Sequence, residues 1–577
     1  MASREPAPTS WWVMVGSAIA IGLIAGFGAV VFRAMIAAIH DLSFHGQLSI
    51  SYDANLHSAP SPWGPGIILV PVLGAVVVAY LVKTFAPEAK GHGVPEVMDA
   101  VYYHEGRIRP VVAAVKSLAS AVSIGSGGSV GREGPIIQIG AAFGSTLGQI
   151  ISMPARQRAM LIASGAGAGI AATFDTPVGG IVFAIELMMP VVSPASLLYV
   201  ALACVTATYV GQSFFGVFPA FNVPALALVE GPEVAATALP WFALLGLLLG
   251  VVAWAMTRGI YWFEDLFDAM PGNYYTRHMS GMFLVGLIIY GFMTLSMPLF
   301  GQPNHYYVQG VGYATIMDIL SENLTAPGFL LLLAGAKLLV TCLTLGSGAS
   351  GGVFSPSLFL GAAFGGGVGS ALTYLLPGLG ATPAHFAYAG MAAIVGGTTG
   401  AAVTAIIMVF EMTRDYTAIL PVILTVAIAS AVRQWLSPAT IYTLKLQRRG
   451  HVVPQGLLGW MGELRSANVM SGDFVLMTDV EAKGAAAAQQ ALANGKVIVV
   501  LRGSDRELLG VVDASSFPGR FATHVTVLPE HRAHEVMRAM QDADARVALV
   551  TRGAEVVGVI TESGLARASY PIARLMD

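Results

Sequence analysis

One acidic side chain, Glu133, stands inside the glycine-rich segment GREGP, in a long apolar part of the chain. A carboxylate in a membrane-buried segment is energetically costly and marks a functional site by default. Beside a helix N-terminus, its ionised form could fill the place of an anion and its protonated form could swing away. We therefore predict that Glu133 is a gate and a proton carrier. The alternative interpretation is a structural partner for Arg132 or a surface charge.

The glycine-rich pattern around Glu133 recurs later in the chain. Gly125–Gly144 and Gly346–Gly365 match at 11 of 20 positions, with an offset of 221 and no gap. A repeat of this kind, in an apolar chain, indicates two related halves with a binding site where they meet. We expect the halves to span residues 10–231 and 232–449.

Each repeated loop is followed by proline and an apolar run, which is typical of a helix start. A helix N-terminus has unpaired N–H groups and about half a positive charge, so it can bind a small anion without a full cation. The candidate anion-binding residues are Gly131, Arg132 and Gly134 in the first loop and Val353 and Phe354 in the second. The simpler alternative is that the glycines only allow close helix packing.

Two further residues are candidate anion ligands. His92 lies in GHGVPEV, a third glycine-rich loop before an apparent helix start, and could donate a hydrogen bond to an anion or point to water. Tyr442 lies at the end of the last apolar segment, where its hydroxyl could close the inner mouth of the site. Tyrosine is common at membrane interfaces, so Tyr442 alone is a weak signal.

Charged residues occur in matching pairs in the two halves. Lys116 pairs with Lys337 at the same offset, and both could raise the local potential for anions. Glu186 and Glu411 pair at offset 225, each after an apolar run. Either glutamate could relay protons, with Glu186 the candidate on the inner side, although a structural role at a helix end is the preferred interpretation for both.

The composition places these residues in a membrane protein. Of 577 residues, 55% are hydrophobic and 11% are charged, with a mean hydropathy of +0.70 and a net charge of −3. Soluble domains carry about 25% charged residues, and a negative net charge argues against nucleic-acid binding. The two cysteines, Cys204 and Cys342, indicate neither a disulfide framework nor a metal site. We expect no cofactor and no enzyme activity.

Several apolar runs are long enough to cross a bilayer, which takes about 20 residues. Trp11–Phe32 is predicted to be the first membrane helix and not a cleaved signal peptide. Basic residues near the ends of apolar runs indicate cytoplasmic faces; they are Arg156, Arg158, Lys445, Arg448 and Arg449. We therefore predict a multi-pass membrane domain over residues 1–450, with both termini cytoplasmic, and a cytoplasmic domain over residues 451–577.

At this point the motifs resemble a known family. GHGVPE, GREGP, GGVFSP and the late Tyr442, in this order, resemble the CLC family of chloride channels and chloride/proton exchangers. The resemblance implies an all-α membrane fold of two inverted-topology repeats with tilted and broken helices, assembled as a homodimer in a prokaryotic plasma membrane. It also implies voltage gating, a gating role for Glu133, and a central anion site at Val353, Phe354 and Tyr442.

Two residues depart from the pattern of the family. His92 stands where the family usually has serine, so a preference for chloride over nitrate does not follow. Leu187 stands where exchangers of the family usually carry an inner proton-transfer glutamate. Since leucine cannot carry a proton, we expect passive, channel-like chloride conduction. The alternative is an antiporter whose protons take another route, through water or Glu186; a remote one is an intramembrane enzyme with Glu133 as acid and His92 as base.

The polar C-terminal part has an α/β pattern. Expected strands at Lys496–Leu501, Leu508–Asp513, Arg546–Val550 and Val556–Gly564 follow helix-like stretches at Ala485–Ala493 and His531–Asp542. These two units resemble a tandem pair of CBS motifs. Asp513, Ser516, Thr561 and Gly564 do not reproduce the Thr-x-x-Asp pattern of ATP-binding versions, so a structural role is expected in place of nucleotide binding.

Overall fold

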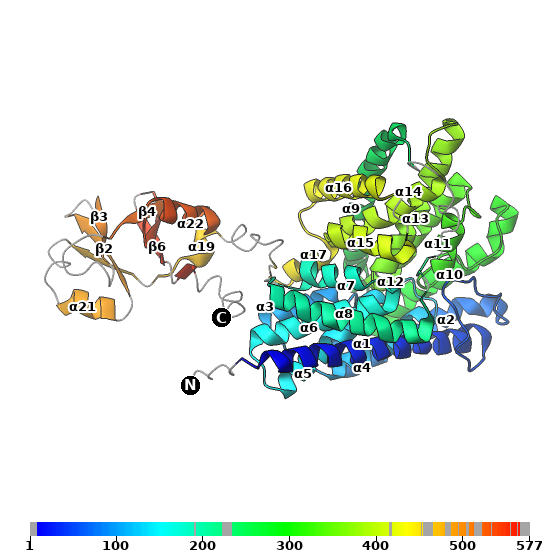
Figure 1. Ribbon diagram of the computed structural model, residues 1–577, viewed down its shortest axis with the longest axis horizontal. Coiled ribbons are helices and arrows are strands. Elements are labelled where there is room, and N and C mark those ends of the chain that lie inside the picture. Colours follow the sequence, from blue (N-terminus) through cyan, green and yellow to red (C-terminus); the bar gives the residue numbers. More distant parts are fainter. Residues whose placement is uncertain are drawn as a thin grey trace. The chain divides into compact units, whose positions relative to one another are not determined.

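The chain forms two compact units, Met1–Val452 and Val453–Asp577 (Figure 1). The computed structural model describes residues 8–189, 192–217, 219–221, 234–414, 418–451, 453, 465–472, 474–478, 486–493, 496–502, 507–512, 522–531, 533–553, 555–561 and 564–565. The first unit is helical throughout its described part, and the second combines helices with strands.

The first half of the helical unit contains α1 (Trp11–His40), α2 (Val70–Phe85), α3 (Val94–Tyr103), α4 (Val111–Gly125), α5 (Glu133–Ile150), α6 (Ala155–Phe174), α7 (Pro177–Phe183) and α8 (Pro194–Phe215). The second half contains α9 (Leu239–Ala269), α10 (Tyr274–Phe300), α11 (Tyr313–Leu320), α12 (Pro327–Ser347), α13 (Phe354–Leu375), α14 (Pro383–Thr399), α15 (Ala402–Thr413), α16 (Ile419–Leu436) and α17 (Ile441–Arg448). Short 3₁₀ or π-helical turns occur at Asp41–His45, Gly64–Leu69, Pro87–Ala89, Ala184–Met188 and Ala236–Ala238.

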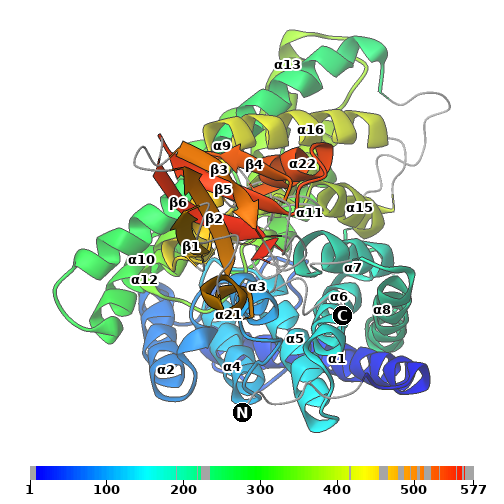
Figure 2. The same cartoon turned by 90° about the vertical axis from the view of Figure 1, so that its left-hand side faces the viewer.

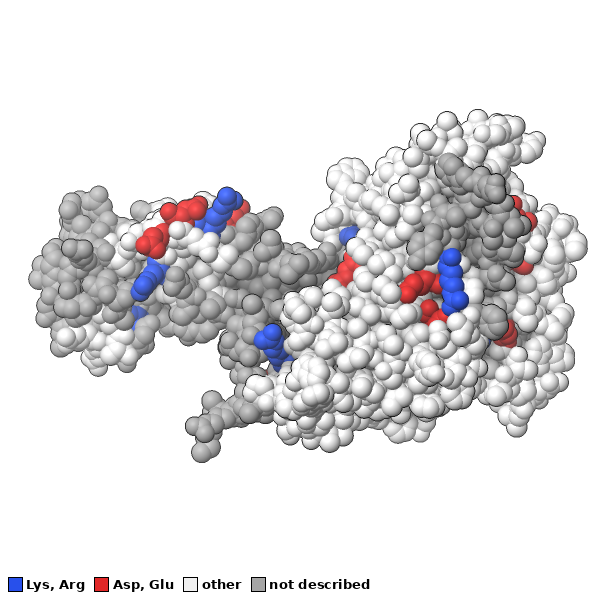
Figure 3. Space-filling view, in the orientation of Figure 1, with Lys and Arg blue, Asp and Glu red and all other residues white. Residues whose placement is uncertain are grey.

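The helical unit has the character of a membrane protein. Within the described residues, 8 helical segments are long and apolar enough to cross a bilayer. The predicted span Trp11–Phe32 continues to His40 as α1. Many large apolar side chains on these helices are exposed, and the face of this unit seen in Figure 3 carries few charged side chains. This surface suits lipid, as the prediction of an all-α membrane fold requires.

The helix starts follow the predicted signals. Both repeated loops lead directly into helices, because α5 begins at Glu133 and α13 begins at Phe354. Pro177, Pro194 and Pro327 occupy the first turn of α7, α8 and α12, where proline lacks only an N–H that would be unpaired anyway. Several of these helices are short, so the unit is built partly from broken helices.

The two halves pack their helices in the same way. Gly140 of α5 and Gly165 of α6 face each other so closely that a Cβ on either would overlap the carbonyl of the other. Gly361 of α13 and Gly390 of α14 repeat this contact in the second half. Figures 1 and 2 show the helices α1–α8 gathered together beside the helices of the second half. The repeat in the sequence is therefore a repeat of packing.

The C-terminal unit consists of two similar three-stranded sheets. One contains β1 (Phe474–Thr478), β2 (Val497–Arg502) and β3 (Glu507–Val512), with α21 (Ala486–Ala493) before β2. The other contains β4 (His524–Val527), β5 (Val547–Arg552) and β6 (Glu555–Thr561), with α22 (Ala533–Asp542) before β5. A short helix, α19, spans Ser466–Val469. In each sheet the first pair of strands is parallel and the second pair antiparallel, which is consistent with a CBS pair.

Four of these strands and both helices lie where the sequence predicts them, whereas β1 and β4 are additional. Thr561 ends β6, and its hydroxyl accepts a hydrogen bond from the Gly564 amide at 3.0 Å. The residues Asp513 and Ser516, considered for nucleotide binding, lie outside the described residues.

Candidate functional site

Backbone hydrogen bonds join the three glycine-rich loops. Gly131 and Gly352, which are equivalent in the repeat, exchange N–H···O bonds of 2.7 and 2.6 Å. The Gly91 amide donates to Ala349 at 2.9 Å, and the Gly351 amide donates to Gly91 at 3.2 Å. The loops at residues 91–93, 131–134 and 349–354 therefore form one backbone cluster. The N-terminal ends of α5 and α13 meet in it.

Glycine is required where these loops touch. A Cβ on Gly134 would overlap the carbonyl of His92 and come within 2.9 Å of the Gly352 Cα. Gly93, at the start of α3, has a φ of 83°, a left-handed conformation that side chains rarely adopt. Any larger residue would separate the loops and draw the helix ends apart.

The Glu133 carboxylate lies at the centre of this cluster, with 1% of the residue exposed. Its Oε2 accepts a hydrogen bond from the Ser355 backbone amide at 3.2 Å. Its Oε1 accepts from the Tyr313 hydroxyl at 2.6 Å and from the Ser355 hydroxyl. A Cβ on Gly131 would occupy the place of the carboxylate. The negative group thus fills a pocket of donors between two helix N-termini, as a bound anion would.

Arg132 does not form the ion pair that the alternative interpretation of Glu133 requires. Its guanidinium lies over the rings of Phe174 and Tyr313, at 5.5 and 5.1 Å from their centroids. Its Nε is buried without a hydrogen-bond partner among the described residues. Arg132 and Arg33 both line a cavity of about 220 Å³. Arg132 therefore places positive charge beside the Glu133 site without neutralising the carboxylate directly.

Val353 and Phe354 lie where the second repeated loop becomes helix α13, and both are buried. Their backbone N–H groups belong to the helix N-terminus, the position from which they were predicted to bind an anion. The Phe354 ring lies 6.0 Å from that of Phe174, which makes the surroundings apolar. The structure brings these two residues close to Glu133, because the Ser355 that follows them donates to its carboxylate; their role in anion binding stays a prediction.

His92 and Tyr442 also lie together. The His92 ring is 6.2 Å from the Tyr442 ring and 6.2 Å from the Tyr261 ring, measured between centroids. His92 is 4% exposed, and its Nδ1 has no hydrogen-bond partner within the described residues. The Tyr261 hydroxyl donates to the Ile441 carbonyl at 2.5 Å, which ties α9 to the start of α17. His92 therefore faces a buried aromatic pair and not bulk water.

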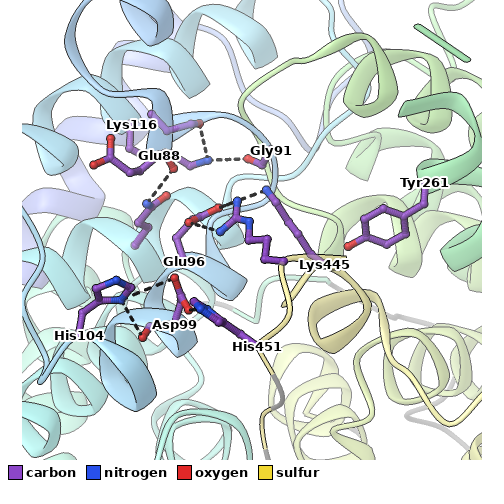
Figure 4. Close-up of polar contacts among 12 residues, drawn as sticks. Glu88, Gly91, Glu96, Asp99, His104, Lys116, Tyr261, Lys445 and His451 are labelled. Carbon is purple, nitrogen blue, oxygen red and sulfur yellow. Dashed lines mark hydrogen bonds and ion pairs between the residues drawn. The ribbon is translucent and has the colours of Figure 1, made fainter. Parts of the chain in front are cut away.

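Charged residues near His92 form a separate network (Figure 4). The Glu96 carboxylate accepts hydrogen bonds of 2.9 and 2.7 Å from Arg449 and lies 3.3 Å from Lys445 Nζ. Burial alone would raise the pKa of Glu96, but the hydrogen bonds from Arg449 and the charge of Lys445 outweigh it and hold the pKa below its ordinary value. Asp99 faces His451 at 2.5 Å. The network fastens the end of α17 to α3, whose first turn follows His92.

The paired lysines hold loops in place. Lys116 Nζ donates to the carbonyls of Ala89 and Gly91 at 3.0 and 2.6 Å. Lys337 Nζ donates to those of Val308 and Gly310 at 3.1 and 2.8 Å. Each lysine thus anchors the loop before a short helix, α3 or α11, by the same contacts. This positioning role was not predicted, and it leaves both positive charges buried near the loop cluster.

The paired glutamates cap each other's helices. Glu186 accepts from the amides of Val403 and Thr404 at 3.3 and 2.8 Å, at the start of α15. Glu411, at the end of α15, accepts from Val178 and Gly179 at 3.1 and 2.6 Å, at the start of α7. These contacts fit the preferred structural interpretation of both residues. Both oxygens of the Glu186 carboxylate are occupied as acceptors, and a proton relay through it would have to break such bonds.

Tyr313 and Ser355, which bind Glu133 directly, were not among the predicted site residues. Tyr313 follows Gly310 and Gly312, the same Gly-x-Gly spacing that precedes α3 in the first half. That spacing, with Lys337 downstream as Lys116 is in the first half, was the available signal for a fourth loop at the site. Ser355 stands in the GGVFSP motif, next to the two residues that were considered.

Comparisons with known proteins agree with this geometry. Residues 74–434 match the family model described as "Voltage gated chloride channel". The H(+)/Cl(-) exchange transporter ClcA of Vibrio parahaemolyticus is 34% identical over 460 residues, which cover 77% of this chain and 91% of the relative. The relative of the same name from Yersinia pseudotuberculosis is 30% identical over 455 residues, covering 78% and 89%.

Solved structures share the fold. A slow cyanobacterial Cl-/H+ antiporter superimposes with a TM-score of 0.62 at 26% identity, covering 77% of this chain and 99% of that one. A eukaryotic CLC transporter, at 18% identity, superimposes with a TM-score of 0.63 over 96% and 98% of the two chains. With its repeated loops, membrane helices and matched family model, the chain is a multi-pass membrane protein that belongs to the CLC family.

Proposed function

We propose that the protein exchanges chloride for protons across a membrane, with Glu133 as the group that both gates the anion path and carries the proton. The observation that supports this most is the Glu133 carboxylate in a pocket of amide and hydroxyl donors between the N-termini of α5 and α13. A carboxylate in such a pocket competes with an anion for the same donors.

This arrangement supports a pocket that the Glu133 carboxylate and a chloride ion occupy in turn. While Glu133 is ionised, it fills the pocket, and the helix N-termini stabilise its charge. On protonation the carboxyl group loses this stabilisation and is free to leave, so a chloride ion can take over the donors, including the Ser355 amide. The anion then passes the N-terminus of α13 towards Tyr442 and His92. Because the same group binds the proton and yields the site to chloride, the two ions are coupled.

We propose antiport in place of the passive conduction that was predicted from the sequence. That preference rested on Leu187, which cannot carry a proton. The Vibrio and Yersinia relatives are named H(+)/Cl(-) exchange transporters, and the cyanobacterial neighbour is a Cl-/H+ antiporter. We therefore propose that protons reach Glu133 without a carboxylate at position 187, with Glu186 and water as the candidate inner route.

The test is proton movement in liposomes that contain the purified protein. With a chloride gradient and no proton gradient, an antiporter moves protons against their electrochemical gradient, whereas a channel does not. We expect Glu133→Gln to carry chloride while losing both proton movement and the dependence of chloride flux on pH. Asp268→Asn, the same chemical change at a side chain 59% exposed, should behave as the unmodified protein.

Two results would contradict the proposal in different ways. Chloride flux without uphill proton movement in the unmodified protein would restore passive conduction. A normal pH dependence in Glu133→Gln would remove Glu133 from the gate. The homodimer, voltage gating and cytoplasmic termini stay predictions, and a bacterial inner membrane is the location we propose.

A further inference from the structure

Helix α11 places Tyr313 beside Glu133. This tyrosine lies outside the repeated glycine motifs. Tyr313 is the first residue of this helix and follows Gly312, whose φ is 78°. Its hydroxyl lies 2.6 Å from Glu133 Oε1 and 2.7 Å from the Ser355 hydroxyl. One phenol thus contacts both the gating carboxylate and a donor from the opposite helix N-terminus.

The Tyr313 ring is held in place from several sides. The residue is 2% exposed, and the Phe221 ring packs edge-on at 5.2 Å between centroids. The Arg132 guanidinium lies 5.1 Å from the ring centroid on another side. Lys337 binds two carbonyls of the loop that leads to α11 and so fixes the start of the helix that carries Tyr313. The hydroxyl is therefore preorganised towards Glu133 and is not a mobile side chain that happens to touch it.

The hydroxyl discriminates between the two protonation states of the gate. A hydrogen bond to an ionised acceptor is about twice as strong as one between neutral groups. Tyr313 and Ser355 both donate to the ionised carboxylate. They consequently stabilise the ionised, pocket-filling form of Glu133 more than the protonated form.

We propose that Tyr313 is a positioning residue of the gate: its hydroxyl, with that of Ser355, holds the ionised Glu133 in the pocket and sets the pH at which the pocket opens to anions. The inference rests on the proposed gating function of Glu133 and adds to it the residues that tune the gate. When Glu133 leaves, the same hydroxyls become free to donate to the incoming anion.

Other charged or titratable groups also face Glu133. Arg132 precedes it on the same loop, and Lys337 of α12 and Tyr442 of α17 interact with it electrostatically. Arg33 of α1 lines the cavity that Arg132 borders. None of these groups is altered when the Tyr313 hydroxyl is removed, so a change in pH dependence on its removal is assigned to that hydroxyl.

The experiment measures chloride flux against pH in liposomes for Tyr313→Phe, which keeps the packed ring and deletes only the hydroxyl. We expect the pH of half-maximal flux to rise by about one unit, the equivalent of losing about 1.4 kcal/mol of selective stabilisation. Ser355→Ala should move the midpoint in the same direction, and it keeps the test decisive if Tyr313→Phe folds poorly. Tyr307→Phe is the matched control, because its hydroxyl donates to Pro303 at 2.8 Å in the same loop and not to Glu133.

Glu133→Gln, alone and combined with Tyr313→Phe, distinguishes two negative results. In one, Tyr313 does not tune the gate; in the other, Glu133 is not the gate. If Glu133→Gln is independent of pH and the double variant equals it, a midpoint shift in Tyr313→Phe supports the inference. An unshifted midpoint in both Tyr313→Phe and Ser355→Ala, with Glu133→Gln still independent of pH, overturns the inference alone. A normal pH profile in Glu133→Gln overturns the gate and the inference together.

Discussion

At the scale of single residues, the site depends on the missing side chain of Gly131 as much as on the carboxylate of Glu133. The carboxylate folds back over Gly131 into the space that a Cβ would fill. The backbone at Gly131 does not have a positive φ, unlike that of Gly127 nearby. Alanine at position 131 therefore needs no strained φ, but its Cβ would overlap the carboxylate in its pocket and lie 3.1 Å from the Ser355 amide nitrogen.

Gly131→Ala should consequently force the carboxylate out of the pocket while the loops stay joined. Overpacking of this kind costs about 1–3 kcal/mol, so we expect the difference in chloride flux between alkaline and acidic pH to shrink about tenfold, with weaker proton coupling. Measurements of chloride flux and proton movement in liposomes over a range of pH test this expectation. Gly16→Ala, where a Cβ meets no atom within 4 Å, is the control. Unchanged coupling in Gly131→Ala would mean that the carboxylate does not need this space.

At the scale of elements, the two halves hold each other through their glutamates. Glu186 of the first half caps α15 of the second, and Glu411 of the second caps α7 of the first. Charged groups that accept from helix N-terminal amides contribute about 0.5–2 kcal/mol each. The caps thus stabilise α7 and α15, two short helices that have few hydrogen bonds of their own.

Glu186→Gln and Glu411→Gln form a matched pair that tests the predicted inner relay. If both residues act only as caps, each variant should lose about 1–2 kcal/mol of stability and keep its proton coupling. Thermal unfolding in detergent measures the loss of stability, and chloride-driven proton movement in liposomes measures the proton coupling. Loss of proton coupling in Glu186→Gln but not in Glu411→Gln, at equal stability, would instead support the relay through Glu186.

At the scale of the whole molecule, the two units have separate cores. The C-terminal sheets pack on one another through Val497, Val499, Val547, Leu549 and Val559, all within that unit. The loop cluster, the lysine anchors and the glutamate caps all lie between Met1 and Val452. The residues proposed to carry transport therefore belong to one unit.

A chain that ends at Val452 should accordingly still fold and carry chloride with the pH dependence of the full protein. We expect a midpoint within about 0.3 pH unit of the full-length value, a difference that corresponds to about 0.4 kcal/mol. Liposome flux and size-exclusion chromatography of the shortened chain are the measurements. A folded but inactive shortened chain would show that residues 453–577 are needed for transport.

Much of this molecule could be predicted from sequence because the signals are local. Membrane helices follow from apolar runs, and helix starts follow from glycine and proline. The repeat was visible because Gly125–Gly144 and Gly346–Gly365 keep the same residues at the same spacing. Strands β1 and β4 were missed because they are short, with 5 and 4 residues.

The sequence by itself determined the membrane character and the two halves, and it pointed to Glu133 as the carboxylate proposed to be the gate, since each signal lies in a short run of residues or in the repetition of one. Only the tertiary structure decided which groups bind that carboxylate. Tyr313 and Ser355 lie 180 and 222 residues from Glu133, and the reciprocal glutamate caps span 217 to 233 residues. Hydrogen bonds act over about 3 Å, so partners this far apart in sequence are set by the packing of the two halves and not by any local pattern.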